Sequence, residues 1–408
     1  MKTHPPAFAR KSGKFFVVSL LVLVGFVPGP GARSETAAEP KPATRPHGPP
    51  SDPAWFPIGV WLQDPRNAVR YRDAGINVYV GLWKGPTAAQ LEMLGKAGMR
   101  VICSQNAVGL SQRDNPMILG WMHGDEPDNA QSLPGGKGYG PPILPEVVRQ
   151  DYERMRQADP SRPVLLNLGQ GVAWDDYIGR GVRRNHPEDY PRYVEGADIV
   201  SFDIYPAVHD HPAVAGKLEF VARGVQRLVA WAGPTRTVWN CIECTRISNP
   251  ATKPTPAQVR SEVWMSLIHG SRGLIYFVHQ FRPVFREAAL LDDPEMLAAV
   301  TSINRRIREL APVLNSPSIP DRVTVTASVP EAPIAWMHKR HRDADYVFAV
   351  NLRNEEVKAT LGSSDWKESK THVEALDETR SLGSAENGHF EDAFGPYAVH
   401  LYRLARVP

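Results

Sequence analysis

Eight short apolar segments rich in β-branched and aromatic residues recur between residues 56 and 277, and helical stretches separate them. Parallel strands that are buried on both faces have this continuous apolar character, and helices connect them in repeated βα units. The stretch from Trp55 to Asn315 also fits the roughly 250 residues of a (β/α)8 barrel. We therefore predict an α/β fold, a TIM barrel over residues 54–316, with strands at 56–61, 76–83, 100–104, 118–123, 163–168, 198–203, 237–242 and 273–277.

Two of the intervening stretches carry apolar stripes with the period of a helix that covers a sheet. One stripe extends from Met296 to Leu314, and the other consists of Val214, Leu218, Val221, Val225 and Leu228. After Pro317 the period becomes two, and Gly, Asn and Asp turns separate short strands. Residues 317–408 are therefore predicted to form a small C-terminal antiparallel β-sandwich domain.

The first 32 residues have the layout of a secretory signal peptide. Basic residues at positions 2, 10, 11 and 14 precede an apolar run over residues 15–27, and Pro, Gly and Ala follow it. This run is shorter than the roughly 20 residues that a membrane-spanning helix needs. We therefore predict a secreted or periplasmic protein without stable membrane insertion. Residues 33–53, rich in Pro and Ala, are predicted to be a disordered linker.

Charge and cysteine content argue against two classes of function. The first 32 residues hold four of the 47 Lys and Arg residues and none of the 44 Asp and Glu residues, so the rest of the chain is nearly neutral. A neutral body gives no indication of a nucleic-acid partner. Cys241 and Cys244 follow strand-like residues, whereas redox C-x-x-C motifs act at a helix N-terminus. They are therefore predicted to be buried thiols.

Two glutamates lie at the ends of predicted strands where active sites of such barrels are found. Glu126 follows the fourth strand, and Glu243 closes the seventh. The βα loops converge over one cavity there, so the two carboxyls are predicted to face each other across the mouth of the barrel. Glycosidic cleavage needs one carboxyl that donates a proton and one carboxylate that attacks the anomeric carbon. The sequence therefore predicts a glycoside hydrolase with Glu126 and Glu243 as its catalytic pair and with no cofactor.

At these strand ends the chain resembles the retaining glycoside hydrolases of clan A, also called the four/seven superfamily. The resemblance implies that Glu126 is the acid/base, that Glu243 is the nucleophile, and that an O-glycosidic bond in a poly- or oligosaccharide is cleaved by double displacement. It also implies that Tyr205, after the sixth strand, hydrogen-bonds the nucleophile. Asp125 stands where the clan has Asn, and its charge is predicted to raise the pKa of Glu126.

Further side chains at neighbouring strand ends are predicted to contact the carbohydrate substrate. Trp83 and Trp174 lie at or beyond strand ends, where a ring can stack on a sugar face. Strand eight carries Tyr276 and His279 where the clan commonly has Trp. The Gly-rich loop over residues 134–141 either folds over substrate through Tyr139 or is a flexible insertion. The predicted substrate-binding residues are thus Asp125, Tyr205, Trp83, Trp174, Tyr276 and His279.

Two alternatives remain open from the sequence. His209 and His211 follow the sixth strand and suggest a metal-dependent hydrolase on the same barrel, with Asp203 or His123 as a further ligand. The third and fourth ligands are not specified by spacing, so a metal site is the weaker prediction. The second alternative is a carbohydrate-binding protein without catalysis, in which the glutamates only hydrogen-bond hydroxyl groups. The sequence gives no indication of the oligomeric state.

Overall fold

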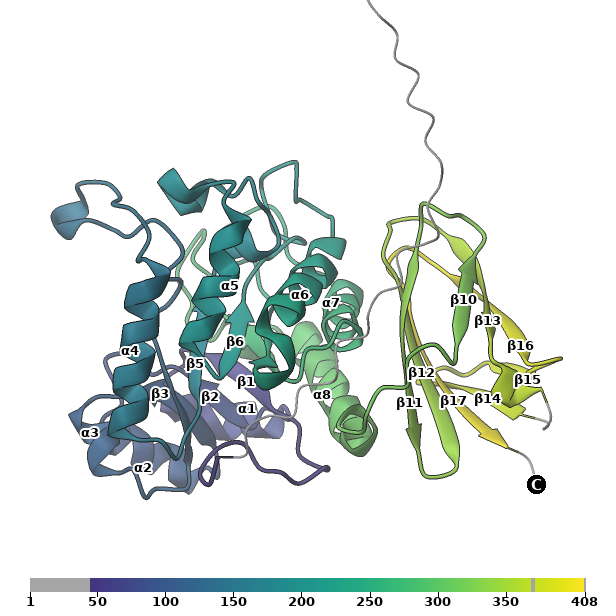
Figure 1. The fold of residues 1–408 in the computed structure, drawn as a ribbon, viewed down its shortest axis with the longest axis horizontal. Coiled ribbons are helices and arrows are strands. Elements are labelled where there is room, and N and C mark those ends of the chain that lie inside the picture. The colour runs from purple at the N-terminus through teal and green to yellow at the C-terminus, as the bar shows by residue number, and fades with distance from the viewer. Residues whose placement is uncertain (1–44, 368–370, 407–408) are drawn as a thin grey trace, which may run out of the picture. The chain divides into compact units, whose positions relative to one another are not determined.

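The computed structural model describes residues 45–367 and 371–406, so the predicted export signal over residues 1–32 lies outside the described part. All eight predicted barrel strands are present in one parallel sheet, of order β7-β6-β5-β4-β3-β2-β1-β9-β8 (Figure 1). The predicted α/β barrel is therefore confirmed. Its strands are β1 (Ile58–Trp61), β2 (Val78–Val80), β3 (Arg100–Ser104), β4 (Ile118–Met122), β5 (Val164–Leu168), β6 (Ile199–Phe202), β7 (Thr237–Val238), β8 (Asn240–Glu243) and β9 (Leu274–Phe277).

The seventh barrel strand is interrupted at Trp239. Its first half, β7, pairs with β6, and its second half, β8, pairs with β9, which in turn pairs with β1. The Trp239 N–H donates to Val200 O over 2.9 Å, and the Asn240 N–H donates to Gly273 O over 3.1 Å. Hydrogen bonding therefore passes from one neighbouring strand to the other at Trp239, which closes the ring of eight strands.

The helices that follow the strands begin and end at recognisable signals. Thr87 and Thr255 each form a capping box, with Gln90 and Gln258 respectively, and Gly233 ends α6 with φ 61°. The helices are α1 (Ala68–Asp73), α2 (Ala88–Lys96), α3 (Ala107–Ser111), α4 (Pro145–Ala158), α5 (Tyr190–Tyr193), α6 (Glu219–Ala232), α7 (Pro256–Ile268) and α8 (Pro294–Leu314). Both predicted apolar stripes are buried, although Val214 and Leu218 precede the first turn of α6.

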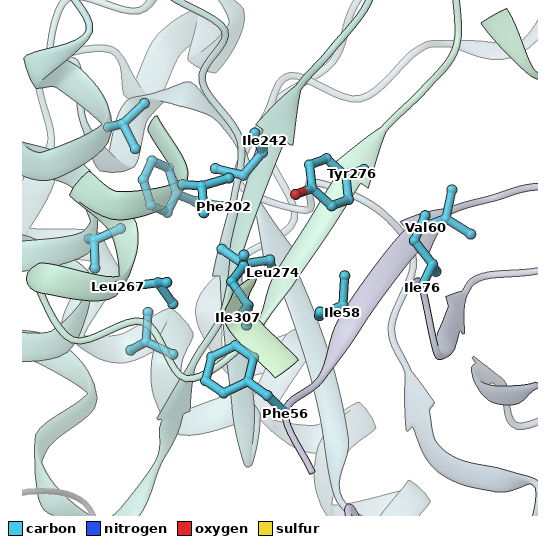
Figure 2. Packing of buried hydrophobic residues seen from close by; sticks show 14 of the residues in the cluster. Phe56, Ile58, Val60, Ile76, Phe202, Ile242, Leu267, Leu274, Tyr276 and Ile307 are labelled. Atoms are coloured by element: carbon cyan, nitrogen blue, oxygen red, sulfur yellow. The ribbon is translucent and has the colours of Figure 1, made fainter. Parts of the chain in front are cut away.

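Alternation along the strands divides the apolar side chains into two cores. Ile58, Leu274 and Tyr276 belong to the cluster that the helices cover, together with Ile307 of α8 (Figure 2). A second cluster is built almost entirely from strand residues and fills the barrel, and it includes Trp61, Val80, Ile102, Leu165, Trp239 and Ile275. The barrel is therefore a packed core, and only its ends offer room for a ligand.

The residues after α8 form two antiparallel sheets, as predicted for a C-terminal β-sandwich. Ser316 follows α8 almost directly, so no long linker separates the two domains. The first sheet contains β10 (Thr324–Ala327), β13 (Val357–Gly362) and β16 (His389–Phe394). The second contains β11 (Ile334–His341), β12 (Ala344–Asn351), β17 (Val399–Arg406), β14 (Thr371–Leu376) and β15 (Ser381–Ser384).

The sandwich and the barrel belong to one compact unit and share a core. The ring of Trp264 on α7 lies 5.1 Å from that of Phe348 on β12. On the same helix, Ser261 Oγ donates to Tyr397 O over 2.7 Å. Because both sides of α7 are covered, nearly all of its side chains are apolar or buried. The sandwich therefore supports the barrel by direct packing.

The prediction of a disordered linker is wrong for residues 45–53, while residues 33–44 lie outside the described part. The Arg45 guanidinium pairs with Asp198 over 2.7 Å, and the His47 N–H donates to Ser161 O over 3.1 Å. Asn315 Nδ2 donates to Pro53 O over 2.8 Å. Composition alone missed these contacts because each one depends on a partner more than 100 residues away. In the described residues, no helix is long and apolar enough to cross a membrane.

Candidate active site

Glu126 follows β4 at the end of the barrel where the C-termini of the strands converge. Its φ of 44° lies in the left-handed region, which residues other than glycine rarely adopt. The Glu126 N–H donates to Asn167 O at the end of β5 over 3.2 Å, and Gln131 Nε2 donates to Glu126 O over 3.2 Å. Backbone strain of this kind persists only where the surroundings enforce it, and it is concentrated at functional sites.

The side chain of Glu126 meets that of Asp203, which directly follows β6. The two carboxyl groups are close enough to share a proton. Burial, the charge of Asp203 and that of Asp125 raise the pKa of Glu126 well above its ordinary value. Burial also raises the pKa of Asp203, although hydrogen bonding from Glu126 opposes this shift. Near neutral pH one carboxyl of the pair therefore keeps a proton while the other is ionised.

Asp125 extends this carboxyl pair into a cluster. Asn167 Nδ2 donates to Asp125 Oδ1 over 3.0 Å, and Ser201 Oγ donates to Asn167 Oδ1 over 2.7 Å, which fixes the orientation of the amide. The walls of the site withdraw the Asp125 carboxyl from part of its water and raise its pKa to about 6, although the residue remains partly exposed. Asp125 in turn raises the pKa of Glu126, as its position beside that residue in the sequence suggested.

Tyr205 lies beside Asp203, whereas the sequence predicted it beside Glu243. Burial and the Asp203 carboxyl raise the pKa of Tyr205, so its hydroxyl stays protonated and lowers the pKa of Asp203 in return. Among the residues that the structure describes, neither the Tyr205 hydroxyl nor Asp203 Oδ1 completes a well-aligned hydrogen bond. Buried polar atoms normally have partners, so these two atoms mark a position for a ligand or for water.

Glu243 does not occupy the predicted position opposite Glu126. It is fully buried, and its carboxyl oxygens accept hydrogen bonds from the backbone N–H groups of Ala207 (2.6 Å) and Val208 (3.0 Å). Its carboxyl neighbour is Glu262 of α7, which is also fully buried, and burial raises the pKa of both glutamates. A carboxyl that water cannot reach has no access to a sugar carbon. Glu243 therefore anchors the loop that follows β6.

Tyr276 was predicted to contact substrate, and the structure corrects this. It is fully buried on the outward face of β9, and its hydroxyl donates to Asn304 Oδ1 of α8 over 2.9 Å (Figure 2). The alternation of β9 directs Tyr276 toward the helices and Phe277 toward the site. His279 is also buried, its Nε2 lies 3.1 Å from Gln63 Nε2, and burial lowers its pKa to about 4. His279 is thus neutral near pH 7.

The two predicted tryptophans differ in their access to a ligand. Trp83 is largely exposed after β2, and Lys84 Nζ lies 6.0 Å from the centre of its ring. Trp174 is buried, with Tyr177 at 6.0 Å and His211 at 4.7 Å between ring centroids. Trp83 is therefore free to stack on a ligand, whereas Trp174 mainly holds its neighbours in place.

The histidines considered for a metal site have other partners. His209 Nδ1 accepts the N–H of His211 over 2.9 Å, so the proton lies on Nε2, which donates to Gln170 Oε1 over 2.9 Å. His211 Nδ1 accepts the N–H of Ala213 over 3.2 Å. The one lone pair of His209 is therefore engaged within the loop. Across residues 45–367 and 371–406, no group of three or more His, Cys, Asp or Glu side chains is arranged to hold a metal ion.

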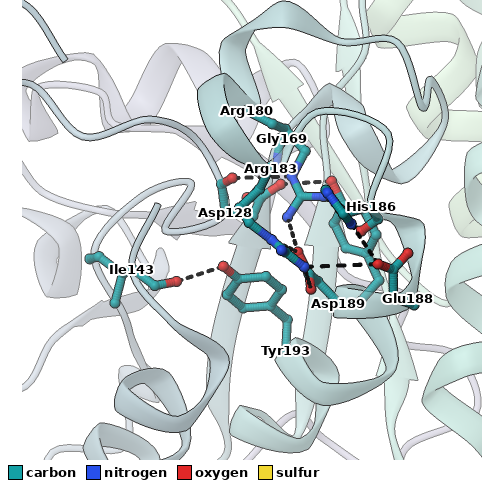
Figure 3. A network of polar contacts seen from close by, with 10 residues as sticks. Asp128, Ile143, Gly169, Arg180, Arg183, His186, Glu188, Asp189 and Tyr193 are labelled. Carbon is teal, nitrogen blue, oxygen red and sulfur yellow. Dashed lines mark hydrogen bonds and ion pairs between the residues drawn. The ribbon is translucent and has the colours of Figure 1, made fainter. Parts of the chain in front are cut away.

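A buried ionic network fixes the loop between β5 and β6 (Figure 3). Asp128 accepts hydrogen bonds from the Gly169 N–H (2.9 Å) and the Tyr190 hydroxyl (3.0 Å). Arg180 donates to Asp128 O over 3.3 Å and pairs with Asp189 over 2.8 Å. Because Asp128 lies two residues after Glu126, this network holds the strained backbone of Glu126 against the next βα loop.

The three cysteines are buried thiols, as predicted for Cys241 and Cys244. Cys241 Sγ lies 3.6 Å from Asn167 Oδ1, and Cys244 Sγ lies 3.4 Å from Phe277 O. Burial raises the pKa of both thiols well above its ordinary value, which suppresses the reactive thiolate. The C-x-x-C spacing therefore has a packing role in this fold.

The sequence indicates Asp203 only as a possible metal ligand, and it gives no indication of a role for Glu262. The rule that selected Glu126 and Glu243, a carboxylate directly after a barrel strand, also selects Asp203 after β6. Glu262 lies in the middle of α7. It is buried beside Glu243 because both sides of that helix are covered, one by the barrel and one by the sandwich. The signal for Asp203 was therefore present in the sequence, whereas the signal for Glu262 was absent.

Sequence comparison identifies no relative: no protein-family model matches the chain, and no curated protein matches it. Solved structures match it by fold. The structure of AmyP in complex with maltose has a TM-score of 0.52 at 10% sequence identity, over 86% of this chain and 96% of that chain. The α-galactosidase I from Mortierella vinacea also has a TM-score of 0.52 at 10% identity, over 87% of this chain and 98% of its own. At this identity the likeness supports the fold, and it agrees with the predicted barrel and sandwich.

Proposed function

We propose that this protein is a glycoside hydrolase in which Glu126 and Asp203 are the catalytic carboxyl pair. The observation that carries the proposal is that these two carboxyls are neighbours at the C-terminal end of the barrel. Active sites of this fold lie at that end, and two carboxyls with opposite protonation states are what glycosidic cleavage requires. The fold shared with AmyP and the α-galactosidase supports the same class of substrate, a carbohydrate.

The surroundings of the two carboxyls assign their roles. Burial and the neighbouring Asp203 and Asp125 carboxyls raise the pKa of Glu126 well above its ordinary value, which suits a proton donor. The neighbouring Glu126 carboxyl and Tyr205 hydroxyl both lower the pKa of Asp203, which favours its ionised form. In the first step Glu126 protonates the glycosidic oxygen, and the Asp203 carboxylate bonds to the anomeric carbon as the leaving group departs. In the second step Glu126 removes a proton from water, which attacks the same carbon and releases Asp203.

The contact between the carboxyls favours a retaining outcome. Inverting enzymes need about 6.5–9.5 Å between their carboxyls to hold the attacking water, whereas retaining pairs stand about 5–5.5 Å apart. The Glu126 and Asp203 carboxyls are neighbours, so their separation is closer to that of a retaining pair than to that of an inverting pair. The reaction uses only these two carboxyls and water. The proposal keeps the reaction class predicted from the sequence and replaces Glu243 by Asp203 as the nucleophile.

A glycoside panel tests this function directly. We expect the protein to hydrolyse at least one class of aryl glycoside, oligosaccharide or polysaccharide. Proton NMR of the first product should show the anomeric configuration of the substrate, because two inversions at one carbon retain it. An inverted first product would contradict the double displacement. Binding of carbohydrates without cleavage of any of them would favour the non-catalytic alternative instead.

We also propose that residues 1–32 direct the protein to a secreted or periplasmic location. The proposal rests on the basic, apolar and small-residue segments of the N-terminus. Protein recovered from outside the cytoplasm of its native host should begin close to Arg33, because the signal is removed on export. A chain that still begins at residue 1, found only in the cytoplasm, would contradict export.

A further inference from the structure

The loop after β9 forms a closed hairpin with an apolar tip. The Gln280 N–H donates to Arg286 O over 2.9 Å, and the Arg286 N–H donates to Gln280 O over 2.8 Å. The five residues between them expose two phenylalanines, with 48% of Phe281 and 59% of Phe285 accessible. Large exposed apolar groups that are held together in one place commonly mark a binding surface.

The two phenylalanine rings form an ordered surface with His279. The ring centroids of Phe281 and Phe285 are 5.9 Å apart with an interplanar angle of 25°. The His279 ring stacks against Phe281 at 6.0 Å and 3°, and against Phe285 at 6.2 Å and 22°. His279 is itself buried and lies against Gln63. The three rings are therefore nearly parallel, and the buried His279 supports the two exposed phenylalanines. We call Phe281 and Phe285 the aromatic platform.

The backbone of the hairpin is tied to the neighbouring βα loop. The N–H groups of Phe281 and Arg282 both donate to Ile247 O, over 2.7 Å and 3.2 Å. Gln280 Nε2 donates to Val284 O over 3.1 Å across the hairpin. A platform that is already rigid loses little conformational freedom when a ligand binds, so more of the contact energy contributes to affinity.

The aromatic platform is continuous with the carboxyl pair. Phe277, at the end of β9, lies 6.1 Å from Phe281 and 5.2 Å from Tyr205, between ring centroids. Tyr205 is the neighbour of Asp203. A row of rings therefore leads from the reacting carboxyls to the surface. Beside the hairpin lies a polar cavity of about 240 Å³, lined among others by Thr245, Arg246, Lys253, Gln280, Arg286 and Asp292.

We propose that the aromatic platform binds sugar units of an extended glycan that lie beyond the bond being cleaved. This rests on the proposed function, and it assigns an oligo- or polysaccharide rather than a small glycoside as the preferred substrate. The apolar C–H face of a pyranose packs on an aromatic ring, while its hydroxyls need polar partners at the edge. The platform supplies the rings, and the adjoining cavity supplies donors and acceptors for the hydroxyls.

Binding is measured in the full chain carrying Glu126→Gln, so that the result does not depend on turnover. The probes are a soluble glucan, galactan and xylan in native affinity electrophoresis, followed by titration with oligosaccharides of the polymer that binds. Phe281→Ala with Phe285→Ala should weaken polymer binding by about tenfold or more. The matched control is Trp336→Ala, which removes an aromatic ring that is 40% exposed on the sandwich, and it should bind as its parent does.

Two further variants test stacking itself. Replacing both phenylalanines by Trp should preserve binding, whereas replacing both by Leu keeps an apolar surface without rings and should lose it. In the otherwise wild-type enzyme, the double Ala variant should lose more kcat/KM on the polymer than on an aryl monosaccharide glycoside. These variants alter exposed side chains, so their thermal unfolding should follow that of the parent.

The proposal would be overturned by unchanged polymer binding of the double Ala variant, by equal binding of the Leu and Trp variants, or by a Glu126→Gln protein that binds no carbohydrate. A wild-type dimer that separates when the platform is removed would show that the platform contacts a second copy, and it would overturn the proposal too. If polymers bind through the platform but the wild type cleaves none of them, the proposed hydrolase function is contradicted, while glycan binding by the platform is supported.

Discussion

Glu126→Gln should lower kcat by about 10²–10⁴-fold on glycosides whose leaving group needs protonation. The glutamine keeps the shape of the side chain but cannot deliver the proton that the raised pKa of Glu126 retains. The loss should be much smaller on a dinitrophenyl glycoside, because that leaving group departs without protonation. Asp203→Asn should lose comparable activity on both kinds of substrate, because the attacking carboxylate is gone. Steady-state kinetics on matched substrates measure the difference.

A matched control for these variants is Asp210→Asn, a carboxylate in the loop after β6 whose side chain is 94% exposed. It should retain wild-type kinetics.

Asp125→Asn gives an independent test, because the Asp125 charge raises the pKa of Glu126. Without that charge Glu126 loses its proton at lower pH, so the alkaline limb of kcat/KM should move to lower pH. A limb that stays in place, or equal losses by Glu126→Gln on both substrates, would contradict the proton-donor role.

Glu243→Ala should lower the free energy of unfolding by about 3–5 kcal/mol. The change leaves Glu262 alone in a buried site and removes the acceptor for the N–H groups of Ala207 and Val208. Unpaired buried donors cost about 1–3 kcal/mol each, so the effect is large for a single side chain. Urea unfolding followed by tryptophan fluorescence measures it. A Glu243→Ala protein as stable as the wild type would contradict the anchoring role.

Glu262→Gln is the matched control, because its amide can still donate to the Glu243 carboxyl. This variant should lower the free energy of unfolding far less than Glu243→Ala does.

The wild type should lose stability as the pH rises from 4.5 toward about 7, since Glu243 binds its proton more tightly in the folded state than in the unfolded state. Glu262→Gln should reduce this dependence of stability on pH, because burial raises the pKa of Glu262 as well and the variant removes that titrating group. Glu243→Gln separates the two assignments of the nucleophile: it should retain measurable activity, whereas Asp203→Asn should not.

Most of the fold could be predicted from the sequence because its signals are local. Strands buried on both faces need continuous apolar runs, and the run at 100–104 matches β3 at both ends. The site was predicted only in part. Glu126 and Tyr205 lie where strand ends placed them, but the partner of Tyr205 is Asp203 and the partner of Glu243 is Glu262. Which carboxyls meet depends on side-chain direction at strand ends, and sequence spacing does not specify that direction.

The amino-acid sequence by itself determined the barrel, the sandwich and the end of the barrel that carries the carboxylates, because hydrophobic period and strand order are properties of neighbouring residues. The tertiary structure alone decided that Glu126 meets Asp203, that two backbone N–H groups hold Glu243, and that Phe281 and Phe285 stand as a platform. The first two of these contacts join segments from different βα units, and hydrogen bonds to Ile247 tie the hairpin of the platform to the neighbouring βα loop. Their geometry is therefore set by the closure of the ring and by the packing of α7 beneath the sandwich.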